Sequence, residues 1–99
     1  MNPDTGLLPG EDLVREGLDA LAQNRLTDSA LLVLIASPRL RALGLKIPAR
    51  SADTPFEHQL YSRLEERFGA AAHSQYNSLI RRIVSFARSL DRERSRTPN

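Results

Sequence analysis

The sequence contains no cysteine and no tryptophan, and only two tyrosines and three phenylalanines among its 99 residues. Without cysteine the chain has neither disulfides nor thiolate ligands for a metal, so nothing in it requires an oxidising compartment. The N-terminus lacks the basic and apolar segments of a secretory signal, and no apolar run approaches the ~20 residues of a membrane-spanning helix. We therefore expect a cytoplasmic protein that does not enter the membrane.

The patterns that accompany catalysis and metal binding are also missing. His58 and His73 are the only histidines, and neither stands at a spacing that assembles zinc ligands. The chain has no GxSxG motif and no glycine-rich phosphate loop. Glu65 and Glu66 are adjacent, so on a helix they point to different faces. We expect a protein that is not an enzyme and that has no catalytic residue, cofactor or metal.

One continuous apolar run, Ala30 to Ala36, stands out from the rest of the chain. A buried strand fits a run of this length as well as a helix does. Helix is favoured because Thr27 is a good N-cap, Asp28 suits a first turn, and no second strand is available for pairing. A helix over 27–36 would be apolar on all sides, so other helices or a second copy of the chain should cover it.

Apolar periodicity predicts four further helices, near 11–25, 38–43, 55–68 and 71–92. Gly17 lies on the apolar face of the first, where it either permits a close helix crossing or is a tolerated defect. Every fourth residue of the helix over 55–68 is apolar and is expected to face the core: Phe56, Leu60, Leu64 and Phe68.

Two sites in the chain carry strong helix-boundary signals. Thr54 and Glu57 have the spacing of a capping box, with Pro55 at the first helical position between them. Gly44 suits the left-handed position after a helix, and Leu45 can then fold back onto that helix. These signals support separate helices on either side of the connection between them.

The predicted fold is therefore all-α, a compact bundle of about five helices with the apolar helix 27–36 at its centre. Residues 1–92 should form a single helical domain. Residues 93–99 contain no apolar side chain and are predicted to be a disordered tail.

Basic residues gather near the C-terminus, although the net charge of the chain is only +2. Arg81, Arg88 and Arg92 fall on one side of the last helix, and Arg82 flanks them. Such a side can bind a phosphate backbone or an acidic partner. It can equally be an ordinary solvated face, on which arginine near a helix C-terminus favours the dipole. No aromatic residue stands among these arginines to stack on bases.

Two functional hypotheses follow. The first is a small non-catalytic protein–protein interaction module that self-associates, because an all-apolar helix is hard to cover within so short a chain. The second, which we do not favour, is a nucleic-acid-binding accessory protein that uses the arginines of the last helix. A helix-turn-helix is disfavoured because the segment 38–43 is too short to be a recognition helix.

Overall fold

The computed structural model describes residues 8–96, and within that range the chain forms helices and connecting turns without a strand. The elements in chain order are α1 (Glu11–Ala22), α2 (Asp28–Ile35), α3 (Ser37–Ala42), α4 (Phe56–Phe68), the 3-10 turn η1 (Gly69–Ala71) and α5 (Ala72–Arg96). The predicted all-α fold is confirmed. Only Ala36 separates α2 from α3, so the described range has four or five α-helices depending on whether these two are counted together.

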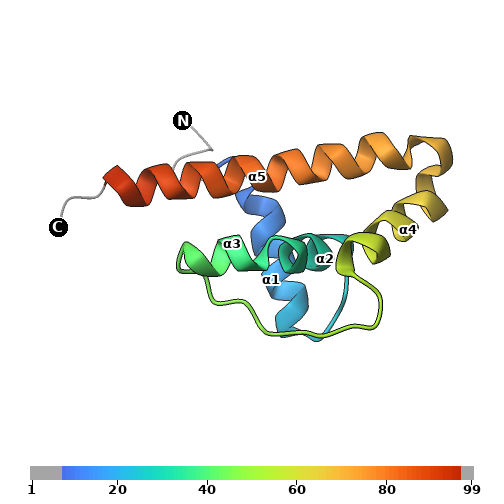
Figure 1. Cartoon of the computed structure of the whole chain (residues 1–99), viewed down its shortest axis with the longest axis horizontal. Helices are drawn as coiled ribbons and strands as arrows, with labels where there is room; N and C mark the ends of the chain where they lie inside the picture. The colour runs from blue at the N-terminus through green and yellow to red at the C-terminus, as the bar shows by residue number, and fades with distance from the viewer. Residues whose placement is uncertain (1–7, 97–99) are drawn as a thin grey trace.

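α5 runs along the longest dimension of the molecule, which measures 45 Å, and the other helices lie to one side of it (Figure 1). α1 crosses α2 closely, and α4 contacts both α2 and α5. Within the described range, no helix is both long enough and apolar enough to cross a membrane.

The apolar helix α2 is the centre of the core, as predicted. Ala30, Leu31, Leu32 and Val33 have no exposed surface, and they pack mainly against α1 and α4. Ile35, at the end of α2, is only half-buried. A single chain therefore buries α2 from Ser29 to Leu34 by itself, so the burial of this segment does not require a second copy of the chain.

The close approach of α1 to α2 depends on Gly17. A Cβ atom at this position would lie 2.5 Å from the carbonyl oxygen of Ser29 and 2.6 Å from Cγ2 of Val33. Both distances are well inside van der Waals contact, so any larger residue forces the helices apart. Of the two interpretations of Gly17, the structure supports the close crossing.

Helix-boundary signals next to α2 and α3 are realised as predicted. The amide of Ala30 donates to Oγ1 of Thr27 at 3.1 Å, so Thr27 caps α2. Gly44 follows α3 with φ +99°, and the amide of Leu45 donates back to the carbonyl of Leu40 at 3.0 Å. This backward bond is characteristic of a Schellman motif and fixes the end of α3.

The capping box predicted for α4 is wrong. α4 begins at Phe56, and no side chain caps its start. Pro55 has ψ 144°, which is extended, so it precedes the helix and does not form its first turn. The side-chain amide of Gln59 donates to the carbonyl of Thr54 at 2.9 Å and holds this entry in place of the predicted cap.

The C-terminal boundary also differs from the prediction. α5 continues to Arg96 and does not end near Arg92, so the prediction of disorder is wrong for residues 93–96. Arginine and glutamate are good helix formers, and a helix already held by packing can extend without further apolar residues. The remaining tail, 97–99, lies outside the described residues, as does the start of the predicted domain, 1–7.

Candidate functional site

The arginines singled out on α5 fall into two groups. Arg81, Arg88 and Arg92, which we call the α5 arginine face, are exposed and form no ion pair with any described residue. Arg82 instead contacts Oδ2 of Asp12 on α1 at 3.1 Å. Arg82 therefore links two helices, and three of the four arginines remain available to an anionic partner.

The histidines and Tyr76 do not form a reactive centre. His58 on α4 and His73 on α5 are both exposed, and Nε2 of His73 lies 3.2 Å from the side-chain nitrogen of Asn77. The described residues hold no group of three or more potential metal ligands. Tyr76 is half-buried, with its ring 5.6 Å from that of Tyr61. Burial raises the pKa of the Tyr76 phenol, and nearby Glu57 adds to this, so Tyr76 serves packing in its neutral form.

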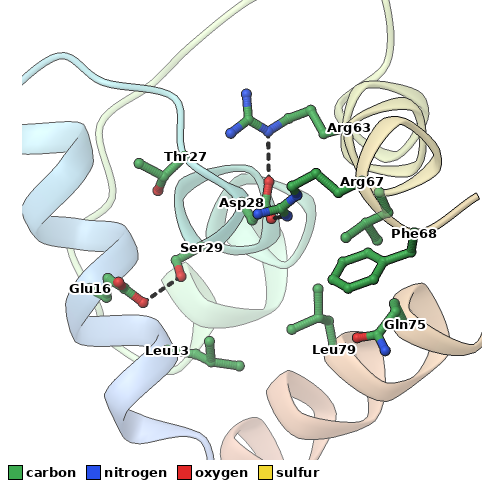
Figure 2. Close-up of a pocket in the computed structure, with 11 residues that line it drawn as sticks. Leu13, Glu16, Thr27, Asp28, Ser29, Arg63, Arg67, Phe68, Gln75 and Leu79 are labelled. Carbon is green, nitrogen blue, oxygen red and sulfur yellow. Dashed lines mark hydrogen bonds and ion pairs between the residues drawn. The ribbon is translucent and has the colours of Figure 1, made fainter. Parts of the chain in front are cut away.

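A recess of about 380 Å³ lies where α1, the start of α2, the end of α4 and the start of α5 meet (Figure 2). We call it the Phe68 recess. Leu64 forms part of its apolar floor and is fully buried, whereas Leu13 and Leu79 are half-buried. The ring of Phe68 is 43% exposed at the edge. The polar lining residues are Glu16, Thr27, Asp28, Ser29, Arg63, Arg67 and Gln75.

Phe68 was expected in the core, and its exposure is a correction. Residues four apart on a helix are rotated by about 40° because a full turn takes 3.6 residues. Leu60 and Leu64, in the middle of the series, face the core and are 0% and 1% exposed. Phe56 and Phe68 lie on either side of that direction, so Phe56 is half-buried and Phe68 reaches the surface.

The α4 side of the recess is basic. Nε of Arg63 donates to Oδ1 of Asp28 at 2.6 Å, and a terminal nitrogen of Arg67 contacts Oδ2 of the same carboxylate. Two guanidinium groups thus share one carboxylate, which is held in the first turn of α2. Arg67 also lies over the ring of Phe68, with its guanidinium carbon 5.4 Å from the ring centroid. The terminal nitrogens of Arg63 point away from Asp28 (Figure 2).

The α1 side of the recess is acidic. The hydroxyl of Ser29 donates to Oε1 of Glu16 at 2.8 Å, which holds the Glu16 carboxylate at this edge (Figure 2). The recess therefore has an apolar floor between a basic edge on α4 and an acidic edge on α1. Among the described residues, no buried polar side-chain atom lacks a hydrogen-bond partner. The recess can bind a molecule that carries both an apolar group and a charged group.

No protein-family model matches the chain, and neither a curated protein nor a solved structure is significantly similar to it. The surface features of the molecule are therefore the basis for proposing its function. Sequence reasoning missed the Phe68 recess because Asp28 and Arg63 are 35 residues apart and their pairing has no local signal. The one usable hint was the four-residue spacing that turns Phe68 away from the core.

Proposed function

We propose that this protein is a non-catalytic protein–protein interaction module and that the Phe68 recess is its docking surface. The observation that carries the proposal is the ring of Phe68, 43% exposed beside an apolar floor and between charged edges. Protein interfaces commonly have an apolar centre and a polar rim, and aromatic and arginine side chains contribute much of their binding energy. We keep the cytoplasmic location expected from the sequence as part of this proposal.

The proposed partner is a different protein. The expectation of self-association relied on an apolar helix that needed covering, and one chain buries α2 from Ser29 to Leu34. The large apolar side chains exposed in the described range are Leu26 in the connection between α1 and α2, Phe68 on α4 and Val84 on α5. They do not form the wide apolar face of an obligate dimer, whereas a recess suits a short segment of another protein.

Selection of helical peptides against the wild-type protein tests this proposal. Selected peptides should shift the methyl resonances of Leu13 and Leu79, and they should bind at least about tenfold more weakly to a Phe68→Asp variant. Val84→Asp is the matched control, since Val84 is 41% exposed on α5 outside the recess. Peptides that lose affinity equally in both variants would contradict docking at Phe68. Light scattering of the free protein tests the oligomeric state.

Nucleic-acid binding is the second candidate, and the unpaired α5 arginine face favours it. If Arg81, Arg88 and Arg92 each neutralise one phosphate, the log of the affinity should fall with the log of salt concentration with a slope of about −3 on duplex DNA. Changing all three to glutamine should flatten that slope. We expect binding no tighter than about 10⁻⁴ M at physiological salt, the weak end of non-specific binding. Micromolar binding that the triple variant abolishes would make this the first candidate.

A further inference from the structure

We infer that the Phe68 recess takes a helical protein segment that presents a carboxylate one turn from a large apolar side chain. The carboxylate would contact Arg63 and Arg67, and the apolar side chain would pack on Phe68. This inference rests on the proposed function and specifies the chemistry of its partner.

The charges on the α4 side call for a second carboxylate. Arg63 and Arg67 carry two positive charges, and Asp28 supplies one negative charge to both. Each guanidinium has five N–H donors, of which the contacts with Asp28 use only a part. The arginine side chains are 47% and 55% exposed, whereas that of Asp28 is only 22% exposed. The surplus charge and the remaining donors are therefore accessible, and a planar carboxylate matches their geometry.

The apolar contact lies directly beside this charge. Because the guanidinium of Arg67 lies over the ring of Phe68, a group bound to Arg67 is next to the exposed ring. Leu13 and Leu79 continue the apolar surface into the recess. The volume of about 380 Å³ is at the lower end of the range for binding sites of small ligands, which suits one or two anchoring side chains. Two partner residues one helical turn apart can reach both features.

The same lining disfavours a nucleic acid at this place. The charged side chains around the recess are Glu16, Asp28, Arg63 and Arg67, two acidic and two basic. A phosphate backbone would bring negative charge to the acidic edge on α1 as well as to the basic edge on α4. A protein segment with one carboxylate and one apolar side chain can place the carboxylate toward Arg63. It then brings no negative charge to the acidic edge on α1.

Changing Asp28 tests the inference because it should change binding affinity and thermal stability in opposite directions. Its carboxylate competes with the partner for Arg63 and Arg67, so Asp28→Asn should strengthen binding of an acidic segment. The same change should lower thermal stability, because Asp28 lies in the first turn of α2 and makes both ion pairs. A residue that only maintained the structure would weaken binding as it weakened the fold.

The probes are two alanine-rich helical peptides of equal length, each with leucine as the anchor. One has glutamate a turn before the leucine, and the other has glutamine there. Affinities come from titrations, up to millimolar peptide, that follow the methyl resonances of Leu13 and Leu79. The acidic peptide should bind wild-type protein about two- to fivefold more tightly than the neutral one. This preference should increase in Asp28→Asn and vanish in Arg67→Gln. Arg81→Gln, on the α5 arginine face, is the control and should leave it unchanged.

The outcomes distinguish failure of the inference alone from failure of the proposed function. Equal binding of both peptides at the recess would reject the proposed role of the partner carboxylate. It would leave the proposal that the recess is a docking surface unaffected. Failure of both peptides to shift the recess would overturn both proposals. Weaker binding of both peptides to Asp28→Asn would show that Asp28 is structural and would reject the inference alone. Displacement of the acidic peptide by duplex DNA through Arg63 and Arg67 would reassign the recess to a polyanion.

Discussion

The helix α2 meets two different kinds of surface. Toward α1 the contact is closed, because Gly17 brings the backbone of α1 against Ser29 and Val33 without space for a Cβ atom. Toward the end of α4, the Phe68 recess leaves an aromatic ring exposed beside two ion pairs. Packing accounts for the first surface. Exposed ion pairs usually contribute only about 0–1 kcal/mol, so stability is a weak explanation for the second. This difference is the basis for assigning binding to the recess.

The closed surface should show the largest effects on stability. Changing the fully buried Leu32 to alanine should lower the free energy of unfolding by about 2–5 kcal/mol, because it leaves a cavity between packed helices. Chemical denaturation measures this loss. Ile35→Ala, at the half-buried end of α2, is the matched control and should cost less. A cost below about 1 kcal/mol for Leu32 would mean that α2 is not the centre of the core.

Gly17→Ala tests whether the crossing of α1 and α2 requires glycine. The sign of the change in the free energy of unfolding gives the answer. At an unconstrained helical position, alanine stabilises by about 1 kcal/mol relative to glycine. At Gly17 the new methyl group would overlap the Ser29 carbonyl, so we expect a loss of about 1–3 kcal/mol in thermal or chemical unfolding. Adding Val33→Ala should not restore stability fully, because the backbone clash remains. A more stable Gly17→Ala protein would show that the two helices can accommodate a methyl group at this position.

These two surfaces also differ in how far the sequence predicts them. α2 and its cap at Thr27 follow from a local apolar run and a local side-chain preference, and the structure has both. Gly17 was recognised as a possible crossing because it interrupts an apolar face. The recess depends on contacts between residues far apart in the chain, such as Asp28 with Arg63 and Arg67, and no local pattern encodes such pairs.

Helix boundaries show the same limit. The capping box predicted at Thr54 has the right residues at the right spacing, yet Pro55 keeps an extended ψ and the helix begins after it. α5 extends past its apolar residues because helix propensity alone can continue a helix that packing has started. Local signals indicated which segments are helical, but they did not give the start of α4 or the end of α5.

The open surface should contribute little to stability. We expect Phe68→Ala to cost less than about 1 kcal/mol in chemical denaturation, because the ring is 43% exposed before the change. Leu64→Ala is the matched variant one turn earlier on α4, and its fully buried side chain should cost about 2–5 kcal/mol. Equal costs for the two variants would make Phe68 a core residue and remove the contrast between the two sides of α2.

The smallest expected effect is at the start of α1 and depends on pH. The amide of Leu8 donates to Oε1 of Glu11 at 2.9 Å, and this bond is the main cause of a Glu11 pKa below its ordinary value of 4.5. Arg15, whose terminal nitrogen lies 2.6 Å from Oε2, lowers the pKa further, and partial burial opposes both. Because folding lowers this pKa, the carboxylate stabilises the fold fully above about pH 4.5 and loses that contribution as the pH falls through the folded value.

Glu11→Gln should therefore be less stable than the wild type by about 0.5–1 kcal/mol at pH 7, and the difference should shrink as the pH falls below 4. Thermal denaturation of both proteins across this range measures it. Arg15→Gln is the control, and it should retain most of the pH dependence because the bond from the Leu8 amide remains. A difference that stays constant with pH would mean that the charge of Glu11 does not stabilise the start of α1.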